Sequence, residues 1–159
     1  MELNREQRLL RRYLDRYRNL TIKYKSLERE KEVLEKDFIG LHAINMDSGS
    51  KPSMAHSPVP PYVIKNEALL NRIIQKKKEA GEALQEIEMV IGMLDENSYE
   101  YTALSLRYIS RMPAEDIAEI IPCHRATVFR IIDRACNNLL KIDKVMSILE
   151  DFSKKILDF

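Results

Sequence analysis

Two apolar heptad stripes, separated by a proline- and serine-rich segment, constrain most strongly what this chain can fold into. The first runs from about Asn4 to Leu41 and the second from about Lys65 to Asp95, with apolar side chains spaced alternately three and four residues apart. Such spacing places these side chains on one face of a helix and is typical of a helix that packs along a partner helix. We therefore expect two long helices, each paired with another helix.

The membership of each stripe defines the predicted contact faces. The first stripe consists of Leu10, Tyr13, Tyr17, Leu20, Tyr24, Leu27, Lys31, Leu34, Phe38 and Leu41, and the second of Leu70, Ile73, Lys77, Ala80, Leu84, Ile87, Ile91 and Leu94. Helices of matching length can pair as an antiparallel hairpin within one chain, and the same stripes can equally form a dimer interface. The sequence leaves both arrangements open.

The composition favours helices and excludes several classes of protein. The 159 residues are 45% hydrophobic and 32% charged with only 4 glycines, which predicts an all-α fold rather than a sandwich or barrel.

Cys123 and Cys136 form no CxxC pair, so we expect no zinc site or other metal, and no disulfide framework. No nucleophile–base set or glycine-rich phosphate loop is visible, so we expect neither an enzyme nor a cofactor. No apolar leader or membrane-spanning stretch is visible, which predicts a cytoplasmic protein without a membrane partner.

The C-terminal third reads as a series of shorter helices. Asn97 with Glu100 three residues later resembles a capping box, and the helix that follows is expected to end at about Ile109. Pro113 is expected to open a second helix, which ends at Ile121 because a residue before proline is pushed out of helical geometry. A third helix is expected from about Arg125, and it either continues into the tail or restarts at about Asp143.

The second and third of these helices have the pattern of a helix-turn-helix, whose second helix enters the major groove of DNA. The expected inward faces are Ile117, Ala118, Ile120 and Ile121 on the first helix and Val128, Ile131, Ile132 and Ala135 on the second, with Cys123 in the turn. The side chains left outside on the second helix are Arg125, Ala126, Thr127, Phe129, Arg130, Asp133 and Arg134.

This outer set suits double-stranded DNA. Arg125 and Arg130 can bond guanine bidentately, Thr127 can bond a phosphate or a base, and Phe129 can contact a thymine methyl group. Arg134, Arg107 and His124 are expected at backbone phosphates, which position the protein without specifying sequence. The net charge of only +1 means that any DNA binding must rest on local placement of charge. For the six arginines Arg5, Arg8, Arg11, Arg12, Arg16 and Arg18, a solvated helix face is favoured over a second DNA contact.

The segment ALSLRYISRMPAEDIAEIIPCHRATVFRIIDRACNNLLKI, within residues 95–142, resembles region four of sigma-seventy-type factors. The matching landmarks, in the family's order, are Leu106-Arg107-Tyr108, Glu115-Asp116-Ile117-Ala118-Glu119, Thr127-Val128 and Arg134-Ala135. Pro122 departs from the family's turn glycine, and His124 departs from its Ser or Thr helix cap. The resemblance implies a DNA-binding helix-turn-helix, and the lack of a sigma region two argues against a complete sigma factor.

The whole layout also resembles a narrower family, the phage-encoded transcription regulators of the ArpU and RinA type. The similarity lies in a charged helical N-terminus, the loop formed by Met46, Ser48, Gly49, Ser50, Lys51 and Pro52, and a second helix leading into LRY. It implies a phage or prophage regulator that binds promoter DNA.

Together these patterns predict five segments along the chain: a coiled-coil helix over residues 1–44, a linker over 45–62, a second long helix over 63–95, a helix-turn-helix domain over 96–142 and an amphipathic helix over 143–159. The favoured function is a sequence-specific DNA-binding regulator, expected to be a homodimer through the long helices or the C-terminal helix because two modest sites reach useful affinity together. The alternatives are a sigma-like adaptor that binds RNA polymerase and a coiled-coil interaction module without DNA binding.

Overall fold

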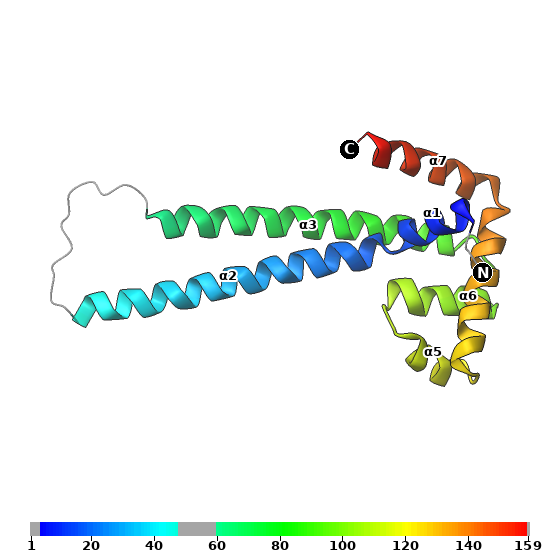
Figure 1. Cartoon of the computed structure of the whole chain (residues 1–159), viewed down its shortest axis with the longest axis horizontal. Coiled ribbons are helices and arrows are strands. Elements are labelled where there is room, and N and C mark those ends of the chain that lie inside the picture. The colour runs from blue at the N-terminus through cyan, green and yellow to red at the C-terminus, as the bar shows by residue number, and fades with distance from the viewer. Residues whose placement is uncertain (1–3, 48–59, 159) are drawn as a thin grey trace. The chain divides into compact units, whose positions relative to one another are not determined.

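The computed structural model describes residues 4–47 and 60–158. These residues form helices and no strand, which confirms the predicted all-α class (Figure 1). The chain divides into two compact units, one comprising residues 20–79 and the other residues 80–158 together with the N-terminal residues up to Asn19. We call the first the hairpin unit and the second the multi-helix unit, and each is considered by itself.

The hairpin unit is formed by parts of the two long helices, α2 (Arg16–Asp47) and α3 (Pro61–Ile91), which run side by side in opposite directions (Figure 1). Phe38 near the end of α2 stacks on Tyr62 at the start of α3, with ring centroids 3.9 Å apart. Farther along, Lys77 Nζ lies 2.6 Å from a carboxylate oxygen of Glu28. The two helices therefore pair within one chain, as the hairpin alternative predicts. Most of the predicted linker, including the loop from Ser48 to Pro52, lies outside the described residues.

The contact face of α3 differs from the predicted stripe. Leu69 is 4% exposed and packs with Leu27 and Ile73, whereas Leu70 is 43% exposed and Lys77 is also exposed, so the prediction is wrong at these last two positions. The buried positions of α3 are Leu69, Ile73, Ala80, Ala83, Ile87, Val90 and Ile91. Two alternative heptad registers of α3 share Ile73, Ala80 and Ile87. One register includes Leu69 and the other includes the adjacent Leu70, so the sequence does not distinguish between them. The described members of the first stripe, on α1 and α2, are all buried or half-buried, as predicted.

In the multi-helix unit, helix α6 (Arg125–Leu140) is the central element. It contacts α1 (Arg5–Leu14), α4 (Tyr99–Leu104), α5 (Ala114–Ile120) and α7 (Asp143–Leu157). A five-residue π-helix, η1 (Ser105–Ile109), follows α4 directly. The core is formed by fully buried side chains from these helices and from the end of α3: Leu10, Leu14, Ile87, Ile91, Leu104, Ile117, Val128, Ile132, Leu139 and Leu149.

Polar side chains define where two of these helices begin. The Asn4 side-chain oxygen accepts a hydrogen bond from the Gln7 backbone N–H at 2.8 Å, which caps α1. The cap of α4 is Ser98, whose Oγ accepts from the Tyr101 N–H at 3.1 Å, so the prediction of an Asn97 cap is wrong by one residue. The Asn97 N–H instead donates to the carboxylate of Asp95, which places Asn97 in the preceding turn.

The other helix boundaries follow local backbone chemistry. The helical segment after Ser98 ends at Ile109 and α6 begins at Arg125, both at predicted positions. A separate helix, α7, begins at Asp143, which is the second of the two alternatives that the sequence left open. Pro113 stands at the N-cap of α5, one residue before the helix, rather than at its first position. The first predicted helix is interrupted at Asp15, which separates α1 from α2. None of the helices in the described part of the chain is long and apolar enough to cross a membrane.

Candidate nucleic-acid interface

Helices α5 and α6 are joined by a four-residue connection, Ile121–His124, that contains no glycine. Ile121 has extended geometry, with φ −96° and ψ 102°, as expected of a residue that precedes proline. Its N–H still donates to the Ile117 carbonyl at 2.8 Å, and the Cys123 N–H donates to the Ala118 carbonyl at 3.3 Å. These two bonds satisfy carbonyl groups at the end of α5, so the chain reverses without a residue at positive φ.

His124 stands at the N-cap of α6 in extended geometry, with φ −78° and ψ 152°. Its side chain makes no cap hydrogen bond, while its backbone carbonyl accepts from the N–H groups of Thr127 and Val128 at 2.9 and 3.2 Å. The other N–H groups of the first turn are therefore not occupied by a cap side chain. This is the weak cap that a histidine in place of Ser or Thr predicts.

The inward face of α6 agrees with the sequence pattern. Val128, Ile131, Ile132 and Ala135 are buried, and the core-facing stripe also includes Cys136 and Leu139. On α5, Ile117 is fully buried and Ala118 half-buried, but Ile120 is 52% exposed, so its assignment to the inward face is wrong. With α5 only seven residues long, its narrow inward face excludes Ile120.

The outward face of α6 brings most of the predicted site residues together. His124, Arg125, Ala126, Arg130, Asp133 and Arg134 are exposed, Phe129 is 38% exposed, and Thr127 is half-buried. Arg107 comes from η1, is half-buried, and donates from Nη1 to the Met112 carbonyl at 3.4 Å. Arg107 thus contacts the loop that precedes α5 and does not belong to the α6 face.

Acidic neighbours hold two of the α6 arginines. Arg125 Nε lies 2.9 Å from a carboxylate oxygen of Glu115 at the start of α5, and its guanidinium lies 5.4 Å from the centre of the Phe129 ring. Arg134 Nε lies 3.4 Å from Glu100 of α4. Both arginines are more than 60% exposed, so each ion pair is worth only ~0–1 kcal/mol and can exchange for another anion at little cost. Arg130 forms no ion pair within residues 4–47 and 60–158.

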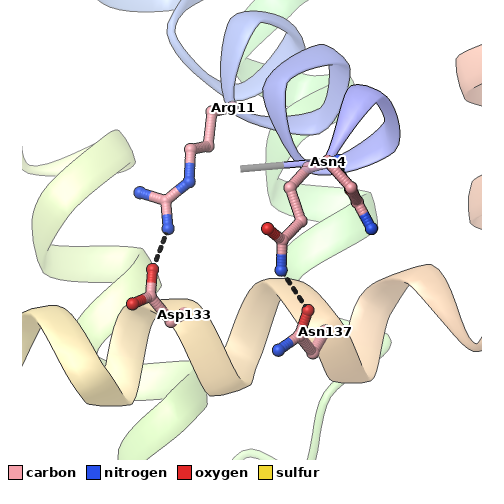
Figure 2. Close-up of polar contacts among 5 residues, drawn as sticks. Asn4, Arg11, Asp133 and Asn137 are labelled. Atoms are coloured by element: carbon pink, nitrogen blue, oxygen red, sulfur yellow. Dashed lines mark hydrogen bonds and ion pairs between the residues drawn. The ribbon is translucent and has the colours of Figure 1, made fainter. Parts of the chain in front are cut away.

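Helix α1 holds the second half of α6, a relationship that no sequence pattern indicated. Arg11 of α1 pairs with Asp133, and Gln7 of α1 donates a hydrogen bond to the Asn137 side chain (Figure 2). On a helix, Asp133 and Asn137 lie on the same face as Ala126 and Arg130. The outward stripe therefore has two parts, a first half open to solvent and a second half engaged by α1.

Two of the six N-terminal arginines thus depart from the predicted solvated face. Arg11 pairs with Asp133 as above, and Arg16 Nη2 lies 2.5 Å from Glu86 while its guanidinium lies 4.1 Å from the Tyr13 ring centre. Both side chains are only about a quarter exposed, at 23% and 26%. Because these partners lie on α6 and α3, 122 and 70 positions away in the sequence, no local pattern could have revealed them.

The multi-helix unit also buries a thiol and a phenol beside α6. Burial raises the pKa of Cys136 to about 11 and the pKa of Tyr108 to about 12, which keeps both groups protonated at neutral pH. A protonated, buried thiol is a poor nucleophile, so Cys136 serves packing. In the part of the chain that the structure describes, no three His, Cys, Asp or Glu side chains gather as a group that could hold a metal ion.

The arrangement presents a short, exposed surface with a planar cation, a second arginine beside an aromatic ring, and a helix start that lacks a side-chain cap. Comparison of the chain with protein-family models, curated proteins and solved structures finds no match.

Proposed function

We propose that this protein is a sequence-specific DNA-binding transcription regulator, encoded by a phage or prophage, that reads the major groove with the first two turns of α6. The observation that carries the proposal is the division of α6 into an inward stripe that is fully used by the core and an outward half that is open. In helix-turn-helix proteins the N-terminal residues of the recognition helix contact base edges. The open half of α6 begins at that end.

The side chains of the open half have distinct roles in this proposal. Arg130 is the principal base reader, because it is exposed and forms no ion pair among the described residues. Arg125, held by Glu115 and lying beside Phe129, reads an adjacent base or a phosphate. Phe129 and Ala126 contact thymine methyl groups, and Thr127 and His124 contact the backbone. Asp133 is removed from the predicted reading set, because Arg11 engages its carboxylate.

The protein acts as a homodimer in this proposal, and the hairpin unit is its interface. Of the two surfaces expected from the sequence, the apolar face of α7 is used inside the multi-helix unit, where Val145 and Leu149 are buried and Phe152 contacts Tyr13. The hairpin unit instead exposes seven large apolar side chains: Ile22, Val33, Ile39, Val63, Ile64, Leu70 and Ile74. Three of them lie on α2 and four on α3, and exposed apolar side chains mark an interaction surface where they gather in one patch.

The experiment that tests the function is a selection of binding sites from random double-stranded DNA with the purified full chain, followed by titration of the selected site against salt. A specific site with a steep salt dependence is expected. Arg130→Ala is expected to lower affinity for the selected site roughly tenfold or more, since a bidentate arginine–guanine contact is worth ~1–3 kcal/mol, and to relax the preference at one base. Arg72→Ala, an exposed arginine of α3, is the matched control.

Failure of the wild-type protein to bind any DNA at low salt would contradict the proposal. In that event, capture of RNA polymerase by the purified chain would identify the sigma-like adaptor. Sedimentation equilibrium of Ile74→Glu tests the dimer separately, with dissociation to monomers as the expected result.

A further inference from the structure

A polar pocket of the multi-helix unit gathers arginines from both ends of the sequence. It has a volume of about 170 Å³ and lies where the start of α2 meets η1 and the loop before α5. Its lining residues are Asp15, Arg18, Arg107, Arg111, Met112 and Pro113. Three arginines and one aspartate thus line the pocket, which gives its lining an excess of positive charge.

The arginines of this pocket are not neutralised by other acidic groups. No ion pair within the described residues involves Arg18, Arg107 or Arg111. Arg107 donates to the Met112 carbonyl, and the Arg111 guanidinium lies 5.5 Å from the centre of the Tyr17 ring. Both contacts fix the direction of a guanidinium, and neither brings a carboxylate to it.

The single carboxylate of the pocket is itself half-buried. Desolvation raises the pKa of Asp15, and the positive charges of Arg18, Arg107 and Arg11 act in the opposite direction. Another lining residue, Arg111, has an unusual backbone conformation: its φ is 59°, a value that non-glycine residues adopt infrequently. That conformation turns the chain between η1 and α5 and places the Arg111 side chain on the pocket wall.

The pocket is connected to the start of α6 through the first turn of α5. Pro113, which forms one wall, is two residues from Glu115, and the Glu115 carboxylate contacts Arg125 at the first position of α6. The pocket wall and the start of α6 are therefore joined through the first turn of α5.

We infer that the pocket formed by Arg18, Arg107 and Arg111 binds a backbone phosphate of the same DNA that α6 reads. The inference rests on the proposed function and extends it, because Arg18 belongs to α2 and lies outside the helix-turn-helix segment. The start of α2 then contributes directly to DNA affinity. Arginine is suited to this role because its planar group binds phosphate oxygens bidentately.

Arg18→Gln tests the inference by removing one exposed cation without disturbing the core. Affinity is expected to fall roughly tenfold at about 0.1 M salt, equally for the selected site and for unrelated DNA, and the salt slope is expected to fall by about one. Arg72→Gln, which removes the same charge from the hairpin unit, is the matched control and is expected to leave the slope unchanged. Equal slopes for Arg18→Gln and the wild type would overturn the inference.

Asp15→Asn provides the opposite change at the same pocket. Removal of the carboxylate leaves three unopposed guanidinium groups, so tighter DNA binding and a steeper salt slope are expected. A pocket with a purely structural role predicts weaker binding in both variants, so tighter binding by Asp15→Asn separates the two explanations. Circular dichroism melting curves of both variants establish that each is folded at the assay temperature.

A free phosphate compound is the other source of the same chemistry. Isothermal titration with inorganic phosphate is expected to show no saturable binding at low millimolar concentration. Saturable binding that Arg18→Gln abolishes, with DNA affinity unchanged, would assign the pocket to a small anion and overturn the DNA contact. Failure of the wild type to bind DNA would instead reject the proposed function, so the two failures are distinguishable.

Discussion

Arg11 of α1 pairs with Asp133 in the middle of α6, and this contact joins two residues that are 122 positions apart in the sequence (Figure 2). The Gln7–Asn137 hydrogen bond lies one turn closer to the start of α1 and one turn closer to the end of α6. Together with the buried Leu10 and Leu14, these contacts fix the N-terminal helix against the helix proposed to read DNA. The N-terminus is therefore an integral part of the proposed reading unit.

The Arg11–Asp133 pair is expected to contribute modestly to stability and little to base readout. Because Asp133 is 52% exposed, a double-mutant cycle with Arg11→Ala and Asp133→Ala is expected to give a coupling of about 0.5–1 kcal/mol in urea unfolding. The preferred DNA sequence is expected to stay unchanged in Asp133→Ala. A changed base preference would show that Asp133 faces DNA after all.

Adjacent leucines of α3 provide a matched pair for the hairpin unit. Leu69→Ala is expected to lower the free energy of unfolding by about 2–4 kcal/mol, because this side chain is 4% exposed and packs against Leu27 and Ile73. Leu70→Ala, at a position 43% exposed, is expected to cost less than about 1 kcal/mol. Thermal and urea unfolding followed by circular dichroism measure both values. Equal losses would contradict the observed packing phase.

The cap of α4 allows a similar comparison. Ser98→Ala is expected to cost about 1 kcal/mol, because Ser98 Oγ accepts the Tyr101 N–H at the start of the helix. Asn97→Ala is expected to be nearly neutral, since Asn97 donates to Asp95 through its backbone N–H, which alanine retains. The urea unfolding midpoints of the two variants measure both losses of stability. A larger loss of stability for Asn97→Ala would show that Asn97 caps the helix, as the capping-box pattern predicts.

Cys136 is expected to make stability depend on pH in alkaline solution. Burial raises its pKa from 9.0 to about 11, so between these values the folded chain retains a proton that the unfolded chain has lost. The free energy of unfolding is therefore unaffected by this group below about pH 9 and falls as the pH rises toward 11. Unfolding midpoints at pH 8 and pH 10.5 are expected to differ more for the wild type than for Cys136→Ala.

Tyr108 adds a second alkaline contribution of the same sign, because burial raises its pKa from 10.0 to about 12. The comparison with Cys136→Ala isolates the thiol from this phenol and from the surface lysines. An identical pH dependence in the wild type and Cys136→Ala would show that the thiol is not buried in solution. Slow alkylation of Cys136 relative to the half-buried Cys123 is an independent check.

Local patterns in the sequence determined the helical class, the start of α6 at Arg125, and the inward set Val128, Ile131, Ile132 and Ala135. They left open whether the helix continues into the tail or restarts at Asp143. These features depend on residue spacing and on backbone restrictions such as the residue before Pro122, which act over one or two helical turns. They also placed most of the proposed DNA-facing residues on one exposed surface. DNA binding itself stays a prediction.

Only the tertiary structure decided which of two heptad phases α3 buries, that α2 and α3 pair within one chain, and that α1 engages Asp133. It also brought Arg18 into one pocket with Arg107 and Arg111. The physical reason is common to all of these features. The sequence of one helix shows which of its faces can pack and which charges it carries. Which other helix packs against that face depends on the apolar burial and charge pairing of segments far apart in the sequence.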